Sequence, residues 1–167
     1  MAYVYLSIGT NIDREKNLSN GLNALSQQFG ELRLSSLFES AAVGFNGSAF
    51  FNMVVGFDTE LSLLELSQLL RDIEFAHGRE ASAKKFSPRT LDLDILLYDD
   101  VICQQPVQLP RAEITENAFV LWPLAEIAPD LVHPVLQQTY RQLWQAYDKN
   151  KQQLTKVPLV WSLEIGS

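Results

Sequence analysis

Two aspartates on one apolar stretch are the first residues in this sequence that could do chemistry. Asp92 and Asp94 alternate with Leu91, Leu93 and Ile95. Successive side chains of a strand point to opposite faces, so the two carboxylates share one face, with ~6 to 7 Å between their Cα atoms. Two like charges at this spacing favour a cation between them, and oxygen ligands favour Mg²⁺ shared with substrate phosphates. The alternative is an exposed acidic pair on a solvated strand.

The basic residues near this pair point to phosphoryl transfer. The net charge is −7, yet five of the thirteen basic residues lie close together: Arg71, Arg79, Lys84, Lys85 and Arg89. Guanidinium groups are forked donors for phosphate oxygens. A basic patch on an acidic protein suits a small polyanion, with a solvated loop as the alternative, and the negative net charge argues against nucleic acid as a partner. The sequence contains neither a G-x-x-x-x-G-K-[ST] loop nor a G-x-G-x-x-G motif after a strand, so any nucleotide site is of another kind.

Hydrophobic periodicity predicts the elements that position these residues. Alternation indicates strands, and spacings of three and four residues indicate helices. The order is β-α-β-β-α-β, which is the ferredoxin-like arrangement of an α+β fold with an antiparallel sheet. We expect strands over 2–8, 31–40, 51–57 and 91–98, a first helix along Leu18, Leu22, Leu25 and Phe29, and a second along Leu63, Leu66, Leu70 and Ile73.

Residues at the helix ends support this reading. Asn11 or Asp13 is expected to cap the first helix and Gly30 to end it, while Ser62 and Glu65 have the spacing of a capping box. Two further helices, over 121–128 and 140–147, are expected to cover the other face of the sheet, which gives a three-layer αβα sandwich. In the C-terminal tail, 148–167, weak alternation over 154–165 is expected to add an edge strand.

Composition sets the remaining expectations. A chain of 167 residues with 47% hydrophobic content suits a single domain over 1–167. No apolar run approaches the eighteen or more residues of a membrane span, and Cys103 is the only cysteine. We therefore expect a monomer in the cytoplasm, without a membrane as a partner.

The run Ser87-Pro88-Arg89-Thr90-Leu91-Asp92-Leu93-Asp94-Ile95 resembles the signature of the 6-hydroxymethyl-7,8-dihydropterin pyrophosphokinases. Further similar segments lie at 7–11, 50–52, 74–79, 119–124 and 126–129, so the resemblance covers nearly the whole chain to about Tyr147. It implies a ferredoxin-like fold. It also implies transfer of the β,γ-pyrophosphate of ATP to the hydroxymethyl group of a reduced pterin in folate biosynthesis, with two Mg²⁺ ions.

The resemblance also implies roles for individual residues. Asp92 and Asp94 would bind both Mg²⁺ ions, and Arg79 and Arg89 would contact the phosphates. Phe119 would stack on the pterin, and the alternative is that it only packs in the core. Glu74 would lie near the nucleotide, and the alternative is a glutamate on the surface of the helix. The pterin would be bound by Ser40, Ala41, Val43, Asn52 and Phe119, and ATP by Arg71, Glu74, Lys84, Lys85, Phe86 and Arg111. Segment 80–88 is expected to close over ATP.

Departures from the family pattern concentrate on the ATP side. Arg111 replaces a phosphate-binding histidine, Ala81 an arginine, and Asn117 a basic residue. Arg111 is expected to compensate, because arginine keeps its charge at every accessible pH. Two other functions stay open at this point: action on a related pterin, and a pterin-binding protein of the same fold without turnover.

Overall fold

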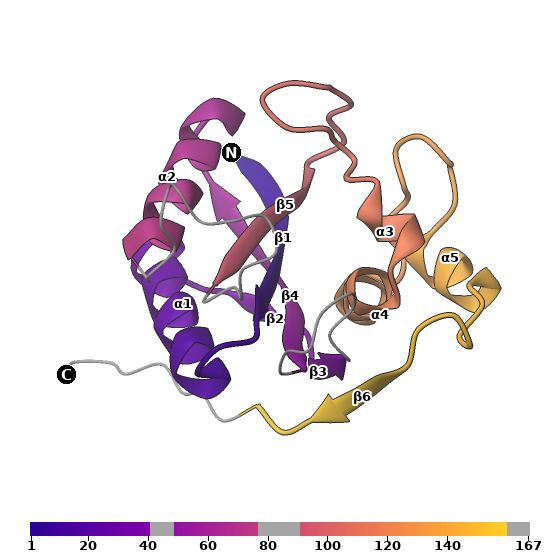
Figure 1. Cartoon of the computed structure of the whole chain (residues 1–167). Coiled ribbons are helices and arrows are strands. Elements are labelled where there is room, and N and C mark those ends of the chain that lie inside the picture. The colour runs from indigo at the N-terminus through magenta and orange to yellow at the C-terminus, as the bar shows by residue number, and fades with distance from the viewer. Residues whose placement is uncertain (41–48, 77–90, 160–167) are drawn as a thin grey trace.

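A computed structural model of the chain describes residues 1–40, 49–76 and 91–159. In these residues, six strands form one sheet in the order β5-β1-β4-β3-β6, β2 also pairs with β4, and each pairing is antiparallel (Figure 1). The strands are β1 Ala2–Thr10, β2 Arg33–Leu34, β3 Leu37–Ser40, β4 Phe50–Thr59, β5 Asp92–Tyr98 and β6 Leu154–Val157. The helices are α1 Arg14–Phe29, α2 Leu63–Ala76, α3 Glu113–Glu116, α4 Ala118–Ile127 and α5 Tyr140–Ala146.

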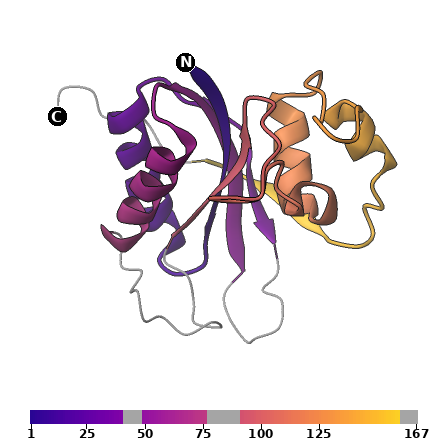
Figure 2. The ribbon, with the colours of Figure 1, turned by 90° about the horizontal axis from the view of Figure 1, so that it is seen from above.

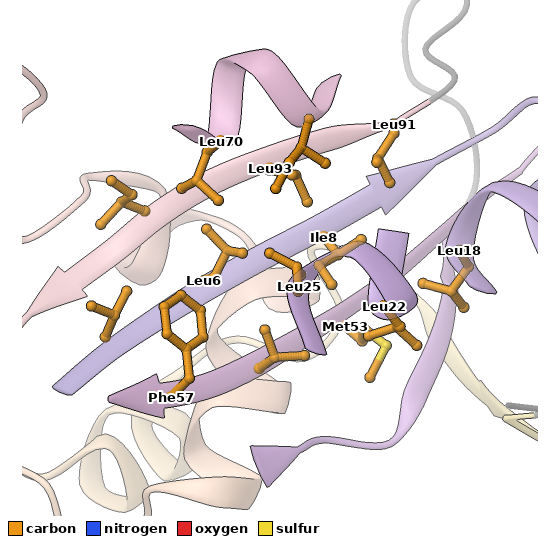
Figure 3. Packing of buried hydrophobic residues seen from close by; sticks show 14 of the residues in the cluster. Leu6, Ile8, Leu18, Leu22, Leu25, Met53, Phe57, Leu70, Leu91 and Leu93 are labelled. Atoms are coloured by element: carbon orange, nitrogen blue, oxygen red, sulfur yellow. The ribbon is translucent and has the colours of Figure 1, made fainter. Parts of the chain in front are cut away.

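The sheet is the middle of three layers, with α1 and α2 on one face and α4 and α5 on the other (Figure 2). Because successive strand side chains point to opposite faces, they belong to two separate hydrophobic clusters, one on each face of the sheet. Leu22 and Leu25 of α1 lie over Ile8 and Leu6 of β1 in the first cluster (Figure 3). The predicted ferredoxin-like α+β sandwich is confirmed. No helix in the described parts of the chain is both long and apolar enough to cross a membrane.

The predicted helix ends are confirmed in two of three cases. Ser62 and Glu65 form the capping box, with N···O distances of 3.0 and 3.2 Å. Gly30 ends α1 with φ of +77°, a conformation that glycine adopts without strain. The predicted side-chain cap of α1 is wrong, because Asp13 occupies the cap position in a left-handed conformation and its side chain makes no capping hydrogen bond.

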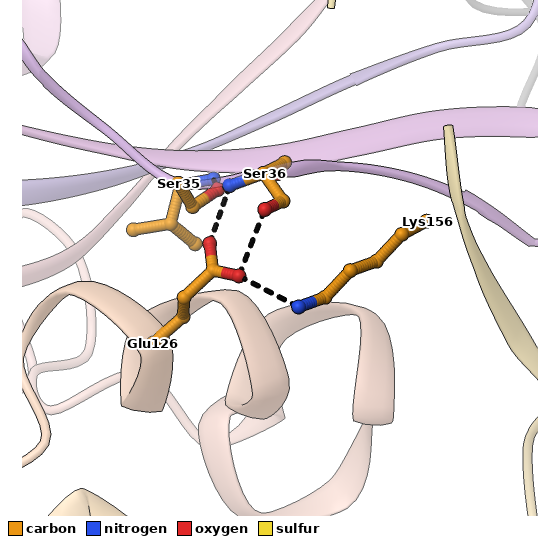
Figure 4. Close-up of polar contacts among 5 residues, drawn as sticks. Ser35, Ser36, Glu126 and Lys156 are labelled. Atoms are coloured by element: carbon orange, nitrogen blue, oxygen red, sulfur yellow. Dashed lines mark hydrogen bonds and ion pairs between the residues drawn. The ribbon is translucent and has the colours of Figure 1, made fainter. Parts of the chain in front are cut away.

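The predicted strand over 31–40 is two short strands, and a pair of serines causes the break. The N–H of Ser35 donates to the carbonyl of Val54, and the hydroxyl oxygen of Ser35 accepts the N–H of Val54, each at 2.9 Å. The N–H and the hydroxyl of Ser36 donate to the carboxylate of Glu126 on α4 (Figure 4). The same carboxylate forms an ion pair with Lys156 of β6, with Nζ 3.1 Å from Oε2. A helix side chain therefore takes the place of a strand partner at this point.

The second half of the chain differs from the prediction mainly in its boundaries. Helix α4 begins at Ala118, three residues before the expected start, and α3 was not predicted because four residues carry no period. Helix α5 begins with a capping box between Thr139 and Gln142. The expected edge strand of the tail is confirmed as β6, which pairs with β3.

Glu126 should carry part of the stability of the fold. Burial alone would raise the pKa of Glu126, but the hydrogen bonds from Ser36 and Lys156 outweigh it and hold the pKa below its ordinary value. Glu126→Gln keeps the shape and removes the charge, so it should lower the free energy of unfolding by about 1–2 kcal/mol near pH 7, measured by urea denaturation.

The pH dependence of this loss separates charge from shape. A carboxylate with a lowered pKa stabilises the fold above its unfolded pKa, and this contribution disappears as the pH falls through the folded pKa. The difference between parent and Glu126→Gln should therefore be full above the ordinary value of 4.5 and shrink below it. A difference that stays constant from pH 7 to pH 3, or an equal loss in the exposed control Glu116→Gln, would contradict the assignment.

Candidate active site

Strand β5 presents Asp92 and Asp94 on one face of the sheet, as predicted. Leu91, Leu93 and Ile95 are buried in the cluster beneath α1 and α2, so the two carboxylates lie on the face that carries α3 and α4. Both aspartates are half-buried. The alternative of an acidic pair on a solvated strand stays open, since the side chain of Asp94 is 46% exposed.

A row of residues across the sheet joins Asp92 to Asn52. Gly9 of β1 is the cross-strand partner of both, and Asn52 in turn pairs with Phe38 of β3. Gly9 has no side chain to fill the space between Asp92 and Asn52. A Cβ at this position would lie 3.4 Å from Asn52 Oδ1. Two strand spacings separate Asp92 from Asn52, which is about 9–10 Å. The glycine thus leaves the sheet surface open between an acidic end and an amide end.

The amide end is built by Asn52 and Ser40. Asn52 is buried within an apolar strand, where an amide needs a hydrogen-bond partner. Its Nδ2 donates to Ser40 Oγ at 2.8 Å, so the structure brings together two of the residues predicted to bind one ligand. Phe119, near the start of α4, packs against the second cluster and stays partly exposed. Ala41 and Val43 lie outside the described residues.

The acidic end includes Arg111, as predicted. Its Nη2 lies 3.5 Å from Asp94 Oδ1, and its Nε lies 3.0 Å from Glu113 Oε2. The backbone N–H of Arg111 donates to the carbonyl of Leu96 on β5 at 3.1 Å, which fixes the residue beside the strand. Glu113 was missed from the sequence, where the signal would have been an acidic residue in the first turn of a helix too short to predict.

Arg111 also borders a cavity of about 240 Å³. Polar side chains on its wall include Gln104, Gln108 and Thr115, and Ile102 supplies an apolar part. His133 lines the same cavity; burial lowers its pKa, and its Nδ1 accepts hydrogen bonds from the backbone of Val135 and Leu136. The acidic end of the row therefore continues into a hollow of mixed polarity.

Glu74 is tied to the same strand from behind. It is buried, and its Oε2 accepts the N–H of Leu93, the residue between the two aspartates, at 2.9 Å. The alternative of a helix-surface glutamate is wrong. Arg71, one turn earlier on α2, is exposed, and within the described residues no hydrogen bond or ion pair joins it to Asp92, Asp94 or Arg111.

Five further predicted residues lie outside the described parts of the chain. They are Arg79, Lys84, Lys85, Phe86 and Arg89, and the segment 80–88 that was expected to close over ATP lies outside as well.

The donor set fits a divalent cation. Asp92 and Asp94 offer carboxylate oxygens on one face, and the guanidinium beside Asp94 shows that this face accepts positive charge. In the described ranges, no group of three or more His, Cys, Asp or Glu side chains forms a closed metal site. Two carboxylates with further oxygens from a substrate are the arrangement that Mg²⁺ favours.

Comparison with known proteins identifies the family of the chain. Residues 5–129 match the family described as 7,8-dihydro-6-hydroxymethylpterin-pyrophosphokinase (HPPK). Over 145 residues, the chain is 33% identical to 2-amino-4-hydroxy-6-hydroxymethyldihydropteridine pyrophosphokinase of Aquifex aeolicus, covering 85% of this chain and 90% of that protein. It is 36% identical over 137 residues to the protein of the same name from Pseudomonas aeruginosa, covering 78% and 83%.

Solved structures share the fold. Plasmodium falciparum HPPK-DHPS with pteroate matches with a TM-score of 0.70 at 15% identity, covering 86% of this chain. The chain spans 43% of that longer protein, so the match concerns one part of it.

Removal of either carboxylate should weaken metal binding with little effect on the fold. Asp92→Asn and Asp94→Asn should each lower the affinity for Mn²⁺, used as a paramagnetic substitute for Mg²⁺, at least about tenfold, because a neutral amide is a poor ligand for a hard cation. Electron paramagnetic resonance measures this affinity in the free protein. Asp100→Asn, at the exposed turn after β5, is the matched control. Equal affinity in all three variants and the parent would exclude the metal site.

Proposed function

Since the chain belongs to the 7,8-dihydro-6-hydroxymethylpterin-pyrophosphokinase family, we propose that it transfers pyrophosphate from MgATP to 6-hydroxymethyl-7,8-dihydropterin in folate biosynthesis. The hydroxymethyl oxygen attacks the β-phosphorus and releases its proton to solvent, the bond between the β-phosphorus and the oxygen that bridges it to the α-phosphorus breaks, and AMP leaves. The observation that carries the proposal is the row Asp92–Gly9–Asn52. It sets a metal-binding end and an amide end on one open face, about two strand spacings apart.

The pterin is proposed to bind at the amide end. Because Asn52 Nδ2 donates to Ser40, Asn52 Oδ1 is oriented to accept an N–H of the pterin. Phe119, with part of its ring exposed, would stack on the pterin face. Ala41 and Val43 complete the proposed pocket. A buried and already bonded amide is pre-organised, so little conformational entropy is lost on binding.

The triphosphate is proposed to bind at the acidic end. Two Mg²⁺ ions held by Asp92, Asp94 and phosphate oxygens would supply charge neutralisation. Glu113 holds Arg111 by its Nε and Asp94 lies beside its Nη2, so Nη1 of the guanidinium would contact a phosphate oxygen. Glu74 keeps the backbone between the aspartates in place. The other proposed ATP contacts come from Arg71, Arg79, Lys84, Lys85, Phe86 and Arg89.

The nucleoside of ATP is proposed to enter the cavity beside Arg111. The amides of Gln104 and Gln108 offer donors and acceptors, and Ile102 offers an apolar surface for a flat base. We also propose that the protein acts as a monomer in the cytoplasm.

The reaction has a direct test. AMP should appear when the protein, MgATP and 6-hydroxymethyl-7,8-dihydropterin are mixed, and not when the pterin or Mg²⁺ is left out. Calorimetry should show pterin and a non-hydrolysable MgATP analogue binding to the same molecule. Pterin binding without nucleotide binding or AMP release would favour a pterin-binding protein and end the enzyme proposal.

Arg111 should contribute to binding of the nucleotide and not to binding of the pterin. Arg111→Ala removes the guanidinium that lies beside Asp94, so binding of the MgATP analogue should weaken at least about tenfold, or ~1.4 kcal/mol. Pterin affinity without nucleotide should stay unchanged, because Asn52 lies across the row at the other end.

Arg141→Ala is the matched control for this variant, since Arg141 on α5 forms an exposed ion pair with Asp130 and its loss should leave both affinities as in the parent. Equal nucleotide affinity in Arg111→Ala and Arg141→Ala would mean that Arg111 makes no contact with the phosphates.

A further inference from the structure

The C-terminal segment 152–157, named here the strap, contacts both sides of the proposed pterin pocket. It follows α5, crosses the start of α4 and joins the sheet as β6 at the outer side of β3 (Figures 1 and 2). It lies beyond residues 5–129, which match the family. The match to the family model therefore does not describe its contacts.

The first contact of the strap is with the N-terminus of α4. Gln152 Oε1 accepts the N–H of Ala118 at 2.8 Å, and Gln152 Nε2 donates to Asn117 Oδ1 at 2.9 Å. The cap residue Asn117 makes no side-chain capping bond to its own helix. Gln152 thus supplies an acceptor for one of the N–H groups that every helix start leaves without an intrahelical partner. The next residue in the helix is Phe119.

The second contact is with the strand that carries Ser40. Strand β6 pairs with β3 along its whole length, and Leu154 lies directly opposite Ser40. Ser40 is the residue that accepts the hydrogen bond from Asn52. Strand β3 has only four residues, and pairing on both sides restricts its movement.

The third contact ties these two sides together. Lys156 Nζ lies 3.1 Å from Glu126 of α4, and it also lies 5.3 Å from the ring centre of Trp122 and 5.9 Å from that of Phe38. Phe38 is the cross-strand neighbour of Asn52. One side chain of the strap therefore contacts α4 and β3 at once.

We propose that the strap is a positioning element of the pterin site, with Gln152 as its positioning residue for Phe119. It holds the aromatic side of the pocket on α4 and the Asn52–Ser40 pair on the sheet at a fixed separation. The nucleotide end is anchored separately, by Leu96 and Glu113 around Arg111, and within the described residues it makes no hydrogen bond or ion pair with the strap. This inference rests on the proposed function, because it assumes that pterin binds there.

Loss of the Gln152 contacts should lower the affinity for the pterin and leave the affinity for the nucleotide unchanged. Gln152→Ala should raise the Kd of 6-hydroxymethyl-7,8-dihydropterin, measured by fluorescence without nucleotide, about fivefold, the size of one lost hydrogen-bond contact. The KM for the pterin should rise in parallel, while kcat and the Kd of the MgATP analogue stay at parent values. Thr155→Pro, which places a residue without an N–H and with a fixed φ opposite Glu39 in β6, should weaken the pairing of β6 with β3 and have a larger effect in the same direction.

Two variants separate positioning from general stability. Gln152→Glu keeps an acceptor for Ala118 and places negative charge at a helix N-terminus, so it should retain pterin affinity within about twofold. Gln153→Ala changes the exposed neighbour and should match the parent. Circular dichroism and the melting temperature establish that each variant is folded at the assay temperature.

The outcomes distinguish this inference from the function on which it rests. If the parent binds pterin and releases AMP, but Gln152→Ala and Thr155→Pro bind pterin as the parent does, the strap has no positioning role. An equal loss of pterin and nucleotide affinity would also overturn it, since that pattern indicates general destabilisation. If the parent itself binds no pterin, the proposed function fails first.

Discussion

The hydrogen bond from the N–H of Leu93 to the buried carboxylate of Glu74 is the interaction on which the site depends most. Among the strands of the described residues, β5 lies at an edge of the sheet, where no strand of that part of the chain receives an outward N–H. Glu74 supplies the acceptor from α2 and fixes the residue between Asp92 and Asp94. A slip of one residue would turn both aspartates into the apolar cluster beneath α1 and α2, at a large desolvation cost. The register of one short strand thus determines which face carries the two carboxylates.

The two ends of the site are held by different parts of the fold. Asp94 and Arg111 belong to β5 and the chain that follows it, with Glu113 completing the ion pairs. Asn52 and Ser40 belong to the other half of the sheet, where β6 supports them. Gly9 of the central strand β1 lies between the halves and adds no side chain of its own. The two proposed substrate positions therefore depend on different sets of contacts, and the sheet fixes their separation.

The sequence was sufficient where a feature repeats along the chain, and insufficient where it depends on one distant contact. The period of two fixed the shared face of Asp92 and Asp94, and the period of three and four fixed α1 and α2. The break at Ser35 and Ser36 could not be predicted, because it depends on Glu126, ninety residues away in the chain. Glu113 and Gln152 were missed for the same reason: each acts through one neighbour, and neither belongs to a periodic pattern. The roles of Arg79, Arg89 and the lysines between them stay predictions.

The glycine at the centre of the row has a consequence for how such a protein changes over evolutionary time. With no side chain at Gly9 to couple the two halves, substitutions at the phosphate end need no compensating changes at the pterin end, and the reverse also holds. By its resemblance to the family, the chain replaces a histidine by Arg111 at one end and matches the family at Asn52 and Phe119 at the other. A glycine between the two ends permits one end of the site to change in sequence while the other stays the same.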